Sequence, residues 1–259
     1  MRRRTALLVA IVGCAIAAHA SPASAQRGGG GAPPQTAKAA APIDLTGYWV
    51  AFVTEDWRYR MIAPLKGDYR SVPLNAEGIR VANMWTPATP EPDACKAFGA
   101  AAIMRVPGRL HVTWQDDNTL RVDTDAGVQT RQFRFAAAGG TGRVGGASAA
   151  AKERTWQGDS SARWERAGAR GGPAASGSLT VVTTNLRAGY LRRNGVPYSE
   201  NATVTEYFDL SPLPGNGQLL IVTTVVEDPQ YLQRPYIVSS HFKKETDASR
   251  WDPTPCSAF

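Results

Sequence analysis

The chain has few residues of the kinds that build metal and thiol sites. Its 259 residues include three cysteines and three histidines, and none of these has the spacing of a zinc ligand set. It also lacks a phosphate-binding loop, a dinucleotide fingerprint and a metalloprotease helix. Ser160-Ser161 lacks the flanking glycines of a nucleophile elbow. These absences argue against the common metal, nucleotide and serine-nucleophile chemistries, and the sequence implies no metal and no cofactor.

Long apolar runs are absent after the N-terminus. The run from Ala6 to Ala18 follows three arginines and precedes the small-residue cleavage site Ala23-Ser24-Ala25, so residues 1–25 are predicted to be an export signal. The run is too short for a spanning helix. We therefore expect no transmembrane helix and a periplasmic or extracellular location in a bacterium.

Two variants of this signal remain open. Arg3-Arg4 fits a twin-arginine signal loosely, so the export route is undecided between that and the general one. The residues up to Cys14 fit a lipoprotein cleavage box loosely, which would leave a lipid anchor at Cys14. We favour cleavage before Gln26, because the apolar run continues past Cys14.

Composition divides the rest of the chain into two parts. Residues 26–42 are mostly Gly, Pro, Ala and Gln and are predicted to be a flexible leader. Residues 43–259 are predicted to form a single β-rich domain. The net charge of +7 includes three signal arginines, and the other arginines are scattered singly. A nucleic-acid partner is therefore not expected, since it would need a basic stripe with interleaved aromatics.

Only Cys95 and Cys256 lie in the expected mature domain. In an exported protein an isolated cysteine pair is more often a disulfide than a catalytic thiol. We expect a bridge that ties the C-terminal tail to the loop after the first helix.

Strand patterns dominate the domain. The motif Leu-x-Val/Ile-x-Thr occurs three times, at 120–124, 179–183 and 219–223, each time after a turn that follows a segment of period 2. This is typical of the second strand of a hairpin. Strand 219–226 is apolar on both faces and should be central. The pattern predicts an antiparallel meander of nine or ten strands that closes into a β-barrel or a sandwich.

One or two short helices are expected before the meander. Asn75 can cap a helix that runs to Trp85, with Ile79 and Ala82 as its apolar stripe. Residues 95–103 are predicted to form a second short helix.

The part from Trp156 to Pro235 resembles a large family of uncharacterised secreted proteins from soil and marine bacteria. The motifs that carry the resemblance are Trp156-Gln157-Gly158-Asp159-Ser160, Trp164-Glu165, residues 179–185, residues 195–199, residues 204–208 and Asp228-Pro229-Gln230-Tyr231. The resemblance implies a secreted β-rich protein and no particular reaction. The chain departs from the family at 166–176, where relatives have a short turn.

Gly47-Tyr48-Trp49 resembles the opening Gly-x-Trp of lipocalins, in which the tryptophan closes one end of the barrel. A core tryptophan on an ordinary first strand explains these three residues equally well.

Glu206 is the sharpest local anomaly. Because side chains alternate between the two faces of a strand, Glu206 shares one face with Ala202, Val204 and Phe208. If that face is the inner one, Glu206 is a general acid or base or a ligand-binding group inside the barrel, or half of a structural Arg–Glu pair. If that face is the outer one, Glu206 is an ordinary surface residue.

A second set of candidate ligand-binding residues lies at strand ends and connections. Arginine forks and tyrosine rings there would suit an anionic, partly apolar ligand, or would only pack loops together. The candidates are Trp57, Arg58, Tyr59, Arg60, Asn185, Arg187, Tyr190, Arg192, Tyr198, Tyr231 and Arg234.

Three functions follow as hypotheses. The first is an exported barrel that binds a small, partly apolar molecule, either anionic or neutral, in its mouth or lumen. The second is a hydrolase, lyase or isomerase on the same barrel with Glu206 as acid or base. The third is a periplasmic structural or interaction domain, which an exposed apolar patch would favour.

Overall fold

The computed structural model describes residues 35–87, 94–136, 153–167 and 176–256. All of them belong to the second of two units of the chain, which begins at Pro34. The expected export signal, Cys14 and the first part of the leader lie outside the described residues. Residues 137–152 and 168–175 lie outside them as well. Among the described residues no helix is both long and apolar enough to span a bilayer.

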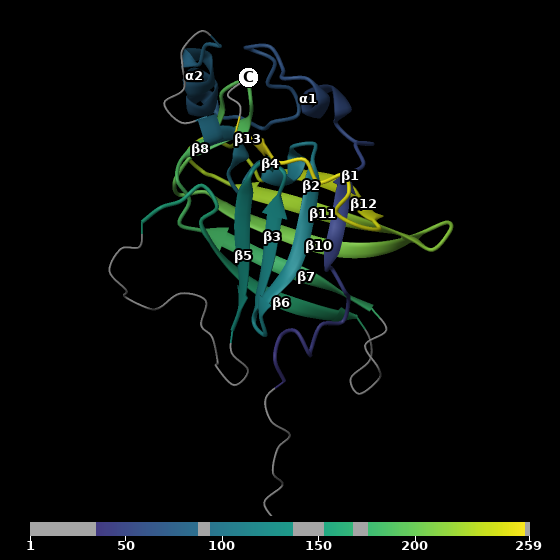
Figure 1. Ribbon diagram of the computed structural model, residues 1–259. Helices are drawn as coiled ribbons and strands as arrows, with labels where there is room; N and C mark the ends of the chain where they lie inside the picture. The colour runs from purple at the N-terminus through teal and green to yellow at the C-terminus, as the bar shows by residue number, and fades with distance from the viewer. Residues whose placement is uncertain (1–34, 88–93, 137–152, 168–175, 257–259) are drawn as a thin grey trace, which may run out of the picture. The chain divides into compact units, whose positions relative to one another are not determined.

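Nine strands close into a barrel (Figure 1). Around the barrel, in order of hydrogen-bonded neighbours, they are β1 (Gly47–Ala51), β12 (Tyr236–Glu245), β11 (Gly217–Glu227), β10 (Thr203–Leu213), β7 (Ser176–Thr184), β6 (Asp159–Ala167), β5 (Gln129–Phe135), β3 (Thr119–Thr124) and β2 (Arg109–Asp116). The expected mainly β fold is confirmed, and it is the barrel rather than the sandwich. Two small pairs accompany it: β8 (Gly189–Arg192) with β9 (Val196–Tyr198), and β4 (Ala126–Gly127) with β13 (Thr254–Pro255).

One pairing departs from the expected antiparallel meander. Strands β5 and β6 run parallel, with Phe133 opposite Ser160, whereas the other barrel neighbours are antiparallel. Parallel neighbours require the chain to cross back to the starting end between the two strands. In the sequence, more than twenty residues separate the end of β5 at Phe135 from the start of β6 at Asp159, which is long enough for such a return.

The three copies of the repeated motif all form second strands of hairpins, β3, β7 and β11. In β3 and β7 the Leu, Val and Thr of the motif are buried. In β11 the buried side chains are instead Leu220, Val222 and Thr224, so this copy is shifted by one residue and its motif faces outward. Because β11 is apolar on both faces, sequence periodicity could not reveal the shift.

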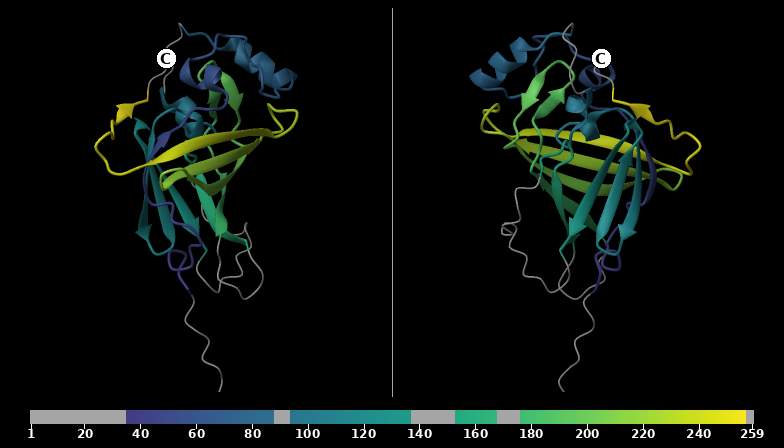
Figure 2. Two further views of the ribbon diagram at one scale, coloured as in Figure 1. Left: turned by 90° about the vertical axis from the view of Figure 1, so that its right-hand side faces the viewer. Right: turned by 60° about the vertical axis from the view of Figure 1, so that its left-hand side comes forward.

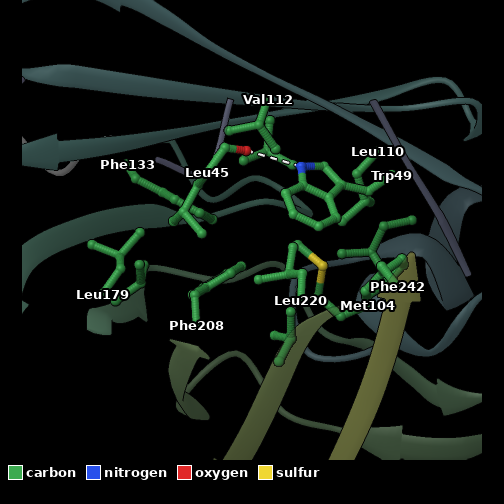
Figure 3. Close-up of a cluster of buried hydrophobic side chains, with 14 of the residues drawn as sticks. Leu45, Trp49, Met104, Leu110, Val112, Phe133, Leu179, Phe208, Leu220 and Phe242 are labelled. Carbon is green, nitrogen blue, oxygen red and sulfur yellow. Dashed lines mark hydrogen bonds between the residues drawn. The ribbon is translucent and has the colours of Figure 1, made fainter. Parts of the chain in front are cut away.

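Apolar side chains fill most of the barrel interior (Figure 3). Trp49 on β1 is completely buried, and its indole nitrogen donates to the carbonyl oxygen of Leu45 at 2.9 Å. The cavity left among these side chains has a volume of about 10 Å³, close to the smallest space that holds one water molecule. Among the described residues, this apolar part of the lumen therefore has no room for a ligand, which leaves the mouth as the place to search.

A second apolar cluster covers one end of the barrel. It joins residues of the connections between strands, including Leu74, Leu191 and Leu232, to the ends of β10, β11 and β12. Figure 2 shows the connections gathered at this end, with the long strands β10, β11 and β12 crossing beneath them. We call it the covered end.

Two helices belong to the covered end: α1 (Trp57–Met61) and α2 (Ala76–Met84). Asn75 caps α2 as expected, accepting from the backbone N–H of Gly78 at 2.8 Å. The expected apolar stripe is wrong in one position, because Ile79 is exposed and the buried residues are Gly78 and Ala82. Gly78 lies so close to the backbone of Tyr231 that a Cβ would approach its carbonyl oxygen to 2.4 Å.

The second expected helix is two short 3-10 pieces, η1 (Ala94–Phe98) and η2 (Ile103–Arg105). The expected disulfide is present, and it joins Cys95 in η1 to Cys256. It ties the C-terminal tail beside β4, with which β13 pairs.

The end of the expected leader packs on the opposite end of the barrel. The carbonyl oxygen of Ala37 accepts from the indole of Trp164 at 2.9 Å, and the backbone N–H of Lys38 donates to Asp117 O at 3.0 Å. Residues 35–42 are therefore part of the folded structure, and the folded chain begins before Ile43. Small residues such as Ala37 fit against the aromatic end of the barrel, which composition does not reveal.

Candidate functional site

Glu206 points into the barrel, as its strand pattern predicts. Its carboxylate receives two hydrogen bonds from Arg131 on β5, at 2.9 and 2.6 Å, and neither side chain is exposed at all. The Arg131 guanidinium also donates to Thr183 Oγ1 at 3.2 Å and lies over the ring of Phe133. Both carboxylate oxygens are thus engaged and shielded from solvent, which is the arrangement of a structural ion pair and not of a proton donor to a substrate.

Three other buried arginines converge at the covered end. Arg60 comes from α1, Arg105 from η2 and Arg192 from the end of β8. Each is at most 6% exposed. They line one cavity of about 30 Å³. We call it the arginine pocket. Its other lining residues are Tyr59, Ala97, Ala102, Val106, Pro107, Leu191 and Arg193.

Two carboxylates serve these three guanidinium groups. Glu55 forms an ion pair with Arg60. Asp56 accepts from Arg105 at 2.6 Å and lies 3.5 Å from Arg192. Within the described part of the chain, one positive charge of this buried set is therefore not matched by an acid of its own.

Carbonyl oxygens and rings hold the guanidinium groups in place. Arg60 Nε donates to the carbonyl oxygen of Arg105 at 2.8 Å, and Arg192 donates to that of Arg70 at 2.7 Å. The guanidinium of Arg192 also lies 4.4 Å from the ring centre of Tyr59. Side chains fixed in this way lose little further freedom when a ligand binds.

Each of the three arginines retains a buried nitrogen without a hydrogen-bond partner among the described residues. These atoms are Nη2 of Arg60, Nη1 of Arg105 and Nε of Arg192. Burial lowers the pKa of Arg60, and this shift is opposed by Glu55 and increased by the Arg105 guanidinium. Arginine nevertheless stays charged in proteins, so the residues that line the pocket hold unused donors and excess positive charge.

The structure brings some of the expected ligand-binding residues together and separates others. Tyr59, Arg60 and Arg192 share the arginine pocket. Trp57 is exposed, and Arg58 pairs with Asp68 at 3.1 Å on the outer side of α1.

The remaining candidates lie elsewhere at the covered end. Tyr198 is buried in the second apolar cluster, where burial raises the pKa of its hydroxyl well above the usual range. Arg187 lies over the ring of Trp156, and Asn185 donates to Asp159. The ring of Tyr190 faces the ammonium of Lys96.

Tyr231 and Arg234 belong to the connection between β11 and β12. Arg234 lines a hollow of about 270 Å³ with Asp228. Asp228 is buried, but its carboxylate accepts from the backbone N–H and hydroxyl of Ser199 at 2.6 and 2.8 Å. This carboxylate therefore holds a turn together and is not free for a ligand.

A larger hollow, of about 650 Å³, lies at the opposite end between residues 38–46 and β2. None of its lining residues is buried. Its polar lining residues are half-buried or exposed, so they give a ligand less affinity and orientation than fully buried polar groups would.

Arg105 and Arg131 are important residues that the sequence patterns did not single out. Both carried a signal: Arg105 directly follows the apolar run Ala100–Met104, and Arg131 shares a strand face with Phe133. A cation inside an apolar pattern marks a buried charge that needs partners. The partners come from distant parts of the chain, so the sequence does not identify them.

No group of three or more His, Cys, Asp and Glu side chains within the described ranges is arranged to hold a metal ion. Comparisons with protein-family models, with curated proteins and with solved structures give no match to the chain.

Proposed function

We propose that the protein binds a small anionic molecule, such as a carboxylate, in the arginine pocket. One observation carries the proposal: three buried guanidinium groups around one cavity each keep an unused N–H donor. A buried donor without a partner costs about 1–3 kcal/mol. An anion that accepts from these donors removes this cost and neutralises the excess positive charge.

The size of the pocket limits what enters it. A cavity of about 30 Å³ admits a charged group but not a whole drug-sized ligand. The rim residues Tyr59, Val106, Pro107 and Arg193 are partly exposed, so the rest of a ligand would extend past them toward solvent. Guanidinium forks bind the paired oxygens of oxyanions well. The ligand is therefore an oxyanion on an aromatic or aliphatic body.

The acid–base alternative has no supporting observation, because the Glu206 carboxylate is fully engaged by Arg131. The expected export would place the arginine pocket in the periplasm or outside the cell.

Calorimetry and thermal shift test the proposal with acetate, benzoate and inorganic phosphate as probes. Arg192→Gln should weaken binding of the best probe at least about tenfold, since a charge-assisted hydrogen bond contributes roughly 1.5–3 kcal/mol. Arg163→Gln is the matched control, because Arg163 is an exposed arginine of β6. It should bind the probe as the wild type does.

A second variant should act in the opposite direction. Asp56→Asn removes a carboxylate that competes with the anion, and asparagine tolerates the left-handed backbone of this position, where φ is 50°. Binding should become tighter. If Asp56→Asn weakens binding as much as Arg192→Gln does, or if no probe raises the melting temperature of the wild type, the proposal is wrong.

A further inference from the structure

The chain exposes an unusual group of large apolar side chains on and just after α1. Trp57, Met61, Ile62 and Leu65 are 57–81% exposed. Trp57 and Met61 are four residues apart on the helix and so lie on the same face. We call these four residues the α1 apolar surface.

The α1 apolar surface is not needed to hold its own segment in place. Tyr59 lies on the opposite side of α1, and Tyr59 and the buried Arg60 both line the arginine pocket. The following loop is held through its backbone, because the buried amide of Asn194 donates to the carbonyl oxygens of Leu65 and Asp68, each at 3.0 Å. The backbone is thus fixed while the apolar side chains remain in water.

The same segment of the chain is rich in exposed cations. Arg58, Lys66 and Arg70 are exposed between residues 57 and 70, and neither Lys66 nor Arg70 forms an ion pair within the described part of the chain. The acidic residues of the same stretch are already paired with arginines: Glu55 with Arg60, Asp56 with Arg105, and Asp68 with Arg58. What faces solvent is therefore apolar and cationic.

We propose that the α1 apolar surface docks on a lipid bilayer that carries anionic headgroups. Tryptophan and aliphatic side chains enter the boundary between headgroups and acyl chains, while lysine and arginine contact the phosphates. A second copy of the chain is a poorer occupant, because a two-fold interface would bring these cations against their own copies.

Vesicle co-sedimentation of the full chain tests the proposal, with vesicles of phosphatidylcholine alone and with added phosphatidylglycerol. The wild type should bind the phosphatidylglycerol vesicles more tightly, and added salt should weaken this binding. Trp57→Ser/Leu65→Ser should reduce the partition coefficient at least about tenfold, from the loss of two buried apolar side chains. The matched control is Met84→Ser/Ile237→Ser, which removes two apolar side chains elsewhere that are each 62% exposed and should bind as the wild type does.

The charge component has its own pair of variants. Lys66→Glu/Arg70→Glu should abolish the preference for phosphatidylglycerol, while Arg234→Glu/Arg250→Glu, with the same change of charge at other exposed positions, should keep most of it. Arg70→Glu keeps the backbone carbonyl oxygen of residue 70, which accepts a hydrogen bond from Arg192. Equal melting temperatures across the set verify that every variant is folded.

Hydrogen–deuterium exchange on the full chain locates the contact independently of any binding by the N-terminal segment. Vesicles should slow amide exchange at residues 57–66 and leave the exchange of the barrel strands unchanged. The proposal is overturned if Trp57→Ser/Leu65→Ser partitions onto vesicles as well as Met84→Ser/Ile237→Ser does. It is also overturned if vesicles give no protection at residues 57–66. A dimer that dissociates in Trp57→Ser/Leu65→Ser would also overturn it, because the surface would then join two copies.

Discussion

The ion pair inside the barrel allows a quantitative test of how the fold tolerates a buried charge. Arg131 and Glu206 are both fully buried and share two short hydrogen bonds. Arg131→Met or Glu206→Leu alone leaves one charge without its partner in an apolar interior. Such a loss destabilises a protein by about 3–5 kcal/mol. For a domain of this size it should lower the melting temperature by roughly 6–20 °C.

The double variant Arg131→Met/Glu206→Leu should recover most of that loss, because it leaves no charge behind and fills the space with apolar atoms. Denaturant unfolding of the wild type, both single variants and the double variant gives the coupling free energy. The exposed pair of Arg163 and Glu165 serves as the control, and its removal should cost less than about 1 kcal/mol.

Two results would refute this reasoning. If either single variant unfolds at the same denaturant concentration as the wild type, the pair contributes no net stability. If the double variant loses as much as the sum of the two single variants, the damage comes from packing and not from an unpaired charge.

Three further changes should alter stability in defined directions. Burial raises the pKa of the Asp209 carboxyl, so the folded state holds this proton more tightly than the unfolded state does, and the free energy of unfolding falls as pH rises through the pKa range. Asp209→Asn should therefore stabilise the protein at neutral pH. Denaturant unfolding should show that this gain vanishes below about pH 4. Cys95→Ser/Cys256→Ser opens a loop with a sequence separation of 161 and should cost about 5 kcal/mol in the chain-entropy model, measured by denaturant unfolding against the oxidised wild type. Gly78→Ala brings a methyl group against the Tyr231 backbone at 2.4 Å and should lower stability by about 1–3 kcal/mol in a thermal melt; an unchanged melting temperature would mean that α2 can move away.

Local patterns predicted much of the fold because they determine local structure. Period 2 identified the hairpins of β2 with β3, β6 with β7 and β10 with β11, and the capping residue Asn75 marked the start of α2. The parallel pairing of β5 with β6 was missed, because it depends on the path of a long connection. The outward orientation of the motif side chains in β11 was missed because both faces of that strand are apolar.

The arginine pocket was only partly predictable. Tyr59, Arg60 and Arg192 were expected near one end of the barrel, but nothing local indicates that Arg105 meets them or that Asp56 pairs with two arginines at once. Such contacts join residues far apart in the chain, and only the closed barrel brings them together. The burial of Arg131 against Glu206 has the same origin.

The position of β1 also has a consequence for how the chain folds. The first strand pairs with β2 on one side and with β12, almost two hundred residues later, on the other. Contacts of such long range slow folding, because much of the chain must be ordered before they form. Until β12 is available, β11 and β1 each present an unpaired edge that can bind another chain. The incomplete polypeptide is therefore the form most exposed to aggregation, and removing β12 should produce an open, self-associating sheet rather than a smaller barrel.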